Sequence, residues 1–166
     1  MNFLKSFKEL QNHFFKKENI INFIIILIIF FLDRISKFEI TNNYDESVIF
    51  INNYINFDLV WNIGIGFGLL SVDSSVLYNL MTLVIGSVII ILIYLSLISE
   101  KIDKLIYSTI IGGALGNFYD RLVYNAVPDF IDIHYLNFHW FTFNVADIFI
   151  TIGILIFILR SFFVKN

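Results

Sequence analysis

The chain has 166 residues, of which 58% are hydrophobic and 15% are charged, and its formal net charge is -3 at neutral pH. A soluble domain carries roughly a quarter charged residues, so this composition and a mean hydropathy of +0.79 indicate a protein surrounded mostly by lipid. The sequence contains no cysteine, which excludes disulfides, thiolate metal sites and a cysteine nucleophile. We expect one integral membrane domain over residues 1–166.

Four apolar stretches are long enough to cross a bilayer, because a spanning helix needs roughly 20 mostly apolar residues. They cover about residues 20–38, 76–98, 105–123 and 143–164. The first stretch continues into Asp33 and Arg34 without a small-residue cleavage signature, so we expect a retained helix and not a cleaved signal peptide. The predicted fold is mainly α, a four-transmembrane-helix bundle.

Most of the basic residues lie at those ends of the stretches that would face the same side of the membrane. They occur in the N-terminal segment, between the second and third stretches and near the C-terminus, as Lys5, Lys8, Lys16, Lys17, Lys101, Lys104, Arg160 and Lys165. Residues 41–75 and 122–142 contain no lysine or arginine. Since cytoplasmic loops are enriched in these residues, we expect both termini in the cytoplasm and these two segments on the outer face.

Two segments outside the stretches have patterns of their own. Before the first stretch, the phenylalanines and leucines between Phe3 and Phe15 alternate with lysines, which predicts an amphipathic helix on the cytoplasmic surface or, equally well, a flank that only sets topology. Residues 47–61 are β-branched and aromatic and are interrupted by Asn52 and Asn53. This pattern predicts two short strands joined by a turn, in a small extracytoplasmic β-sheet after the first helix.

Polar side chains recur near the outer ends of three of the four stretches. They are Asp33, Lys37, Asn117, Asp120, Arg121, Asn144 and Asp147. An ionisable group within a bilayer costs several kcal/mol unless it is paired or faces water, so each is a functional candidate. Because successive helices alternate in direction, all of these groups are expected at one depth, close to the outer interface.

Some of these residues also have structural interpretations. Asp33 and Lys37 are spaced i, i+4 and could form an ion pair within one helix. Asp120 and Arg121 could form a structural pair, and the glycines of segment 112–116 are typical of closely packed helices. Asp147 has no basic residue near it in sequence, so a structural role explains it least well.

The available side chains favour carboxylate chemistry. Ser36 and Lys37 are adjacent and diverge on a helix, and no nucleophile elbow is present, which disfavours a serine mechanism. The three histidines include no His-Glu-x-x-His pair, which disfavours a zinc protease. We expect no bound metal and no cofactor.

Asp147 then needs a second acid to act on a peptide bond. The candidates on the outer side are Asp120, Asp129 and Asp132, and the residue pattern alone does not choose between them. Two neighbouring carboxyl groups share one proton, which leaves one as general base and the other as general acid. Such a pair can activate water against a peptide carbonyl.

Five segments, in this order, resemble the lipoprotein signal peptidase (signal peptidase II) family. They are Asp33-Arg-Ile-Ser-Lys37, Asn62-Ile-Gly64-Ile-Gly66-Phe67, Gly112-Gly-Ala-Leu-Gly-Asn-Phe-Tyr-Asp-Arg121, Val127-Pro-Asp-Phe130 and Phe143-Asn-Val-Ala-Asp147. The resemblance implies that Asp129 and Asp147 are the catalytic pair of an aspartic endopeptidase. Gly66 is a departure, since the family more often has alanine or serine there, and we expect it to loosen that loop.

The resemblance also implies supporting residues. Those expected to line the substrate groove are Asn62, Gly113, Asn117, Arg121 and Asn144. Asp33 and Lys37 are expected to steady the first helix, and Asp120 to play a supporting role beside Arg121. Pro128 is expected to bend a loop that carries Asp129 toward the membrane.

The implied substrate is a prolipoprotein whose lipobox cysteine carries diacylglycerol, cut on the N-terminal side of that cysteine. The implied location is the bacterial cytoplasmic (inner) membrane, with membrane lipids as the other partner, no nucleic acid, and a monomeric enzyme. Two alternatives from other classes remain at this stage. One is a small proton-coupled transporter, although the inner halves of the stretches contain few polar groups; the other is a non-catalytic scaffold whose polar residues join helices.

Overall fold

The computed structural model describes residues 16–43, 48–64 and 75–163. They form four helices: α2 (Lys17–Asn43), α3 (Ser75–Ile98), α4 (Lys101–Tyr124) and α5 (Val145–Phe163). They also form four strands: β1 (Ile49–Asn52), β2 (Ile55–Asn62), β3 (Val127–Tyr135) and β4 (Phe138–Phe143). The predicted amphipathic segment before residue 16 and the departure at Gly66 lie outside the described residues.

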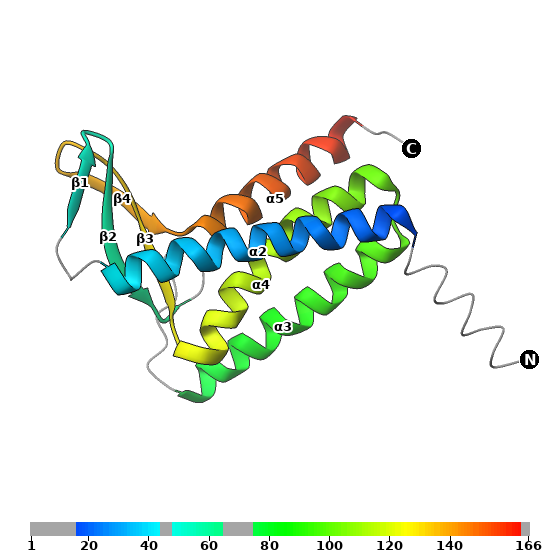
Figure 1. The fold of residues 1–166 in the computed structure, drawn as a ribbon, viewed down its shortest axis with the longest axis horizontal. Coiled ribbons are helices and arrows are strands. Elements are labelled where there is room, and N and C mark those ends of the chain that lie inside the picture. The colour runs from blue at the N-terminus through cyan, green and yellow to red at the C-terminus, as the bar shows by residue number, and fades with distance from the viewer. Residues whose placement is uncertain (1–15, 44–47, 65–74, 164–166) are drawn as a thin grey trace, which may run out of the picture.

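The four helices form an up-and-down bundle with the sheet at one end (Figure 1). Helices α2 and α4 end near the sheet, and α5 begins there. The start of α2 and the end of α5 lie at the opposite end of the bundle. The alternating helix directions predicted from the sequence are therefore confirmed, and residues near the sheet ends of α2, α4 and α5 come to one level.

Three helices, α2, α3 and α5, are long and apolar enough to cross a membrane. At most 17% of their most apolar windows is buried inside the protein, so these helices present their hydrophobic side chains outward, as a lipid-facing surface requires. Helix α4 occupies the predicted third stretch but is more polar, and it packs against all three others. Because its neighbours cover it, α4 can carry buried polar residues such as Lys104 and Asp120 that a lipid-facing helix could not.

The glycines of α4 allow this close packing. A Cβ at Gly112 would lie 2.8 Å from Cβ of Ile29 on α2, and one at Gly113 would lie 2.5 Å from the backbone oxygen of Ala146 on α5. A Cβ at Gly116 would meet the Asp33 carboxylate. The interpretation of these glycines as packing residues is thus supported on both sides of α4.

The substitution Gly113→Ala is expected to lower the free energy of unfolding by about 1–3 kcal/mol. The added methyl group would overlap a backbone oxygen in the first turn of α5, which cannot rotate away, so α5 must shift. The control is Gly86→Ala on α3, whose Cβ would lie 3.1 Å from ring atoms of the Phe118 side chain, which can adjust. Thermal unfolding in detergent should show a clear drop for Gly113→Ala and a smaller one for Gly86→Ala; equal melting temperatures would contradict this.

The strands form one antiparallel sheet in the order β1-β2-β3-β4. The first two strands and their turn were predicted: the Asn52 side chain accepts hydrogen bonds from the backbone N–H groups of Tyr54 (2.8 Å) and Ile55 (3.0 Å), which closes the turn. The other two strands were not predicted, because residues 122–142 were interpreted only as an outward segment.

The prediction of a loop at Pro128 was wrong. Pro128 and Asp129 are the second and third residues of β3, and they pair with Trp61 and Val60 of β2. A proline is tolerated near the start of a strand, where its missing N–H costs least. Asn125, with a φ of 54°, ends α4 in the left-handed conformation and turns the chain into β3.

Candidate active site

Asp147 lies in the first turn of α5, where it exchanges two hydrogen bonds with Asn144. The backbone N–H of Asp147 donates to the Asn144 side-chain oxygen at 3.1 Å, and the backbone N–H of Asn144 donates to Oδ2 of Asp147 at 3.2 Å. This reciprocal arrangement is a capping box, which satisfies N–H groups that a helix start leaves free. It fixes the Asp147 carboxylate at the positive end of the helix dipole, where negative charge is stabilised.

Asp129 lies on β3 and is almost fully buried, with 3% of its surface exposed. Its Oδ2 accepts a hydrogen bond from the Asn62 amide of β2 at 2.8 Å, and its Oδ1 accepts one from the Asn144 amide at 2.5 Å. Asn144 therefore contacts both acids: its amide nitrogen donates to Asp129 and its oxygen accepts from the backbone of Asp147. One residue, Asn144, therefore links the Asp129 carboxylate to the first turn of α5, and its backbone N–H donates to the Asp147 carboxylate.

The pKa of Asp129 is raised from 3.8 to about 6, mainly because burial disfavours the charged form and secondly because of the negative charge of Asp147. Hydrogen bonds from Asn62 and Asn144 act in the opposite direction. Near neutral pH Asp129 can thus hold a proton far more readily than an exposed aspartate. This is the property that one member of an acid–base carboxyl pair needs.

The stability of the protein should depend on pH through Asp129. Since its folded-state pKa lies above the unfolded value, the folded state binds the proton more tightly, and this contribution is fully present below about pH 4 and is lost as pH rises to about 6. The free energy of unfolding should fall by on the order of 3 kcal/mol across this pH range. The melting temperature of Asp129→Asn should not show this decline with rising pH. The difference in melting temperature between the variant and the wild type should therefore change between about pH 4 and pH 6. A difference that stays constant from pH 4 to pH 7 would refute the raised pKa.

Lys37 is the centre of a second group, the Lys37 cluster, which consists of Asp33, Lys37, Asn117 and Asp120. The Lys37 ammonium donates to Oδ2 of Asp33 at 2.8 Å, to Oδ1 of Asn117 at 2.7 Å and to Oδ2 of Asp120 at 2.7 Å. Lysine has three N–H donors, so all are used. The predicted ion pair within α2 is confirmed, and the same ammonium also joins α2 to α4.

The Lys37 cluster contacts the Asp147 carboxylate and the neighbouring backbone of α5. The Asn117 amide nitrogen donates to Oδ1 of Asp147 at 2.7 Å. Oδ1 of Asp33 accepts the backbone N–H of Ala146 at 3.0 Å, in the first turn of α5. Asp33 therefore anchors the helix that carries Asp147, a more specific arrangement than the predicted steadying of the first helix.

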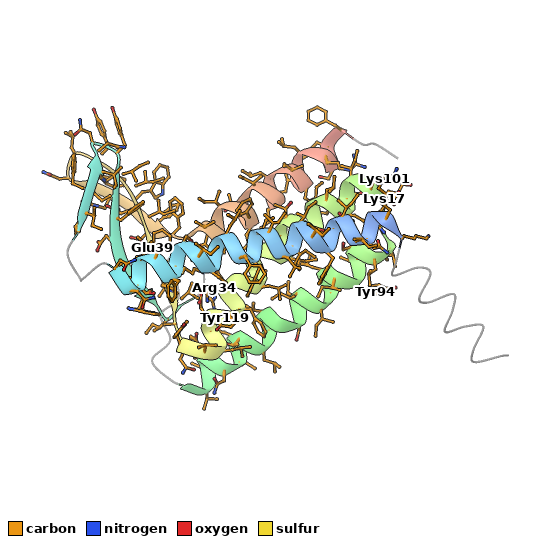
Figure 2. The ribbon with its side chains drawn as sticks, viewed as in Figure 1. Lys17, Arg34, Glu39, Tyr94, Lys101 and Tyr119 are labelled. Atoms are coloured by element: carbon orange, nitrogen blue, oxygen red, sulfur yellow. The ribbon has the colours of Figure 1, made fainter. Side chains whose placement is uncertain are left out.

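Asp120 and Arg121 do not form the structural pair that their adjacency in the sequence suggested. The ion pairs of Asp120 within the described chain are with Lys37 and Arg34. The Arg34 guanidinium also lies 4.8 Å from the ring centre of Tyr119, and both residues are labelled in Figure 2. Arg121 instead donates to the backbone oxygens of Asn117 (3.2 Å) and Gly64 (3.1 Å). Neighbouring residues on a helix diverge by about 100°, which explains why the two side chains separate.

The structure distinguishes the three acids that were possible partners of Asp147. Asp120 belongs to the Lys37 cluster, and Asp132 contacts His139 on the sheet. Asp129 is the acid linked to Asp147 through Asn144. Arg34 was not predicted as a site residue; the signal was its place one residue after Asp33 in an apolar stretch. Asp132, His134 and His139 also form a group that could hold a metal.

Comparison with known proteins gives consistent matches over most of the chain. Residues 25–163 match the family model of signal peptidase (SPase) II, the Peptidase_A8 family. The chain is 50% identical over 149 residues to a lipoprotein signal peptidase of Pelagibacter ubique, covering 88% of this chain and 90% of that protein. It is 39% identical over 150 residues to a lipoprotein signal peptidase of Francisella tularensis subsp. novicida, covering 87% and 92%.

Two solved structures, described as bacterial membrane enzymes, have the same fold. The structure at 2.3 Å resolution aligns with a TM-score of 0.72 and 26% identity over 85% of this chain and 87% of its own. The structure at 1.9 Å resolution aligns with a TM-score of 0.70 and 25% identity over 87% of this chain and 93% of its own.

Proposed function

Since this chain belongs to the lipoprotein signal peptidase (signal peptidase II) family, it is an aspartic peptidase that cleaves the signal peptides of prolipoproteins, and we propose that Asp129 and Asp147 are its catalytic pair. The observation that supports this pair is the shared contact with Asn144, whose amide nitrogen donates to Asp129 and whose oxygen accepts from the backbone of Asp147. It brings acids from β3 and α5 together at the end of the bundle where the sheet lies.

The proposed reaction uses one protonated and one ionised carboxyl group. Asp147, as carboxylate, takes a proton from water while the oxygen of that water attacks the peptide carbonyl carbon. Asp129, as carboxylic acid, gives its proton to the carbonyl oxygen, so a neutral tetrahedral intermediate forms. Collapse of the intermediate returns the hydroxyl proton to Asp129 as the C–N bond breaks, and Asp147 protonates the leaving amine. The raised pKa of Asp129, to about 6, supports its assignment as the acid.

The amides around the pair are proposed to position it and to face the substrate. Asn62 and Asn144 hold Asp129, while Asn117 holds Asp147. Arg121 joins α4 to the backbone at Gly64, next to Asn62. Gly113 packs against the backbone of Ala146. We propose that it contributes to the substrate groove by allowing α5 to lie close to α4.

We propose that the substrate carries diacylglycerol on its lipobox cysteine and is cut on the N-terminal side of that cysteine. The sides of α2, α3 and α5 are apolar and outward-facing, so a signal helix and acyl chains can approach from lipid. At the end of the bundle away from the sheet, Lys17 and Lys101 are exposed (Figure 2). From the positive-inside bias we propose that this end lies in the cytoplasm and that the acid pair lies near the outer face.

The proposal is tested by a cleavage assay in liposomes on one prolipoprotein with and without prior diacylglyceryl transfer. Mass spectrometry should find a new N-terminus at the modified cysteine, and only in the lipidated substrate. Cleavage should continue in the presence of EDTA, because carboxyl groups and not a metal activate the water. Equal cleavage of the unmodified substrate would contradict the proposed lipid requirement. Loss of all cleavage in EDTA, in protein whose melting temperature EDTA does not change, would contradict the carboxylate mechanism.

A further inference from the structure

A second group of chemically reactive side chains lies on the β3–β4 hairpin. Asp132 and His134 are two residues apart on β3 and are both buried, whereas Ile133 between them is exposed. His139 of β4 pairs directly with His134 across the hairpin. Alternation along a strand and direct cross-strand pairing therefore bring the three side chains to one face.

The three side chains converge on a small volume. Oδ2 of Asp132 lies 2.7 Å from Nδ1 of His139 and 3.6 Å from Nδ1 of His134. One possible ligand atom from each residue lies within 4.8 Å of the other two, and the two imidazole rings are stacked with centres 5.3 Å apart. In a tetrahedral site with bonds of about 2.0–2.1 Å, neighbouring ligand atoms are about 3.3 Å apart. Side-chain adjustments alone can bring the three ligand atoms from the present distances to this spacing, because His139 is 58% exposed and has room to move.

His134 supplies an independent sign of a missing partner. Its Nδ1 is buried and has no hydrogen-bond partner among the described residues, and the side chain is only 8% exposed. The carboxylate oxygen at 3.6 Å is too far away for a hydrogen bond. A buried polar atom without a partner is costly, and native structures contain few of them. This atom points at the same carboxylate that His139 contacts.

We propose that Asp132, His134 and His139 bind a divalent first-row transition-metal ion, of which Zn²⁺ is the representative probe. Two imidazoles and one carboxylate suit Zn²⁺ and its neighbours, whereas Mg²⁺ and Ca²⁺ prefer oxygen ligands. The ion satisfies Nδ1 of His134 and joins β3 to β4. Asp129 is the third residue of β3, and β4 ends next to Asn144, so the ion stabilises the strands that support the acid pair without taking part in hydrolysis.

The test measures metal binding by protein without a polyhistidine tag, purified in detergent and stripped with EDTA. Titration calorimetry should show one Zn²⁺ per chain, Zn²⁺ should raise the melting temperature, and Co²⁺ should give the visible absorption bands of nitrogen-ligated cobalt. Mg²⁺ should do none of these. Because no substrate is present, the outcome does not depend on the proposed catalytic pair.

Two variants remove ligands and two serve as controls. His139→Gln, at an exposed position, and Asp132→Asn should weaken Zn²⁺ binding at least about 100-fold, more than the loss of an outer-shell partner costs. Asp58→Asn removes another carboxylate of the sheet, and His13→Gln removes the third histidine of the sequence; both should bind Zn²⁺ as the wild type does. The proposal is overturned if wild-type protein gives no cobalt bands and no Zn²⁺-dependent rise in melting temperature, or if both ligand variants bind Zn²⁺ with unchanged affinity.

Discussion

Asp147→Asn is expected to abolish cleavage of a lipid-modified prolipoprotein, with a fall in kcat/KM of at least about 10³-fold, while the protein remains folded in the membrane. An asparagine cannot take a proton from water at neutral pH, so the general base is lost. The change is nearly isosteric, and an asparagine oxygen can still accept the hydrogen bond from Asn117 that Asp147 receives. Only the long hydrogen bond of 3.2 Å from the Asn144 backbone N–H would be lost, because an amide nitrogen cannot accept it.

Asp129→Asn should cause a loss of similar size for a different reason. Both oxygens of Asp129 accept hydrogen bonds from amide groups, at 2.8 Å and 2.5 Å. An asparagine must direct its own N–H₂ at one of these donors, so we expect an additional loss of about 1–3 kcal/mol in stability. The control is Asp58→Asn on β2, which should cleave at the wild-type rate. Wild-type activity in either Asp129→Asn or Asp147→Asn, measured on membranes with matched amounts of inserted protein, would exclude the proposed catalytic pair.

The sequence was sufficient to predict the helices and the common level of the polar residues along the bundle, because both follow from local signals. A bilayer excludes ionisable groups so strongly that each one in an apolar stretch is conspicuous. Asp33, Lys37 and Asp120 could therefore be predicted to meet at one level once the helix directions were fixed. The positions at which α2, α3, α4 and α5 occur agree with the four predicted stretches.

The second half of the sheet could not be predicted in the same way. Strand β4 reads Phe-His-Trp-Phe-Thr-Phe, without the alternation of apolar and polar residues that marks a half-buried strand. Strand β3 begins with Val127 and Pro128, and a proline usually argues against a strand. The pairing of β3 with β2 joins residues that are far apart in sequence, such as Asn62 and Val127, so a local pattern does not reveal it.

The connections between polar residues were also beyond the sequence pattern. The spacing of Asp33 and Lys37 predicts their ion pair, but nothing local shows that the other oxygen of Asp33 holds the backbone of Ala146, 113 residues away. Likewise, the i, i+3 spacing of Asn144 and Asp147 indicates a shared face, yet the contact of Asn144 with Asp129 depends on the hairpin between them. The choice of Asp129 as the second acid came from resemblance to a family and not from spacing.

Lys37→Met is expected to be the most destabilising single substitution at the Lys37 cluster, with a loss of about 3–5 kcal/mol. Lys37 is 1% exposed and its two carboxylate partners, Asp33 and Asp120, are fully buried. Methionine fills a similar volume but donates no hydrogen bond, so two buried carboxylates lose a counter-charge. Asp33 in turn holds the first turn of α5, so we expect the loss of stability to be accompanied by a loss of cleavage.

A matched control separates this effect from the general cost of removing a buried lysine. Lys104 is 5% exposed and donates at 2.6 Å to the side-chain oxygen of Asn19, which is neutral. Lys104→Met should therefore cost only about 1–3 kcal/mol. Combining Lys37→Met with Asp33→Asn should restore part of the lost stability, because it removes the carboxylate that Lys37→Met leaves without a counter-charge, whereas Asp120 keeps its ion pair with Arg34. If Lys37→Met and Lys104→Met lower the melting temperature equally, and the double variant restores nothing, then charge compensation by Lys37 is not what holds α2, α4 and α5 together.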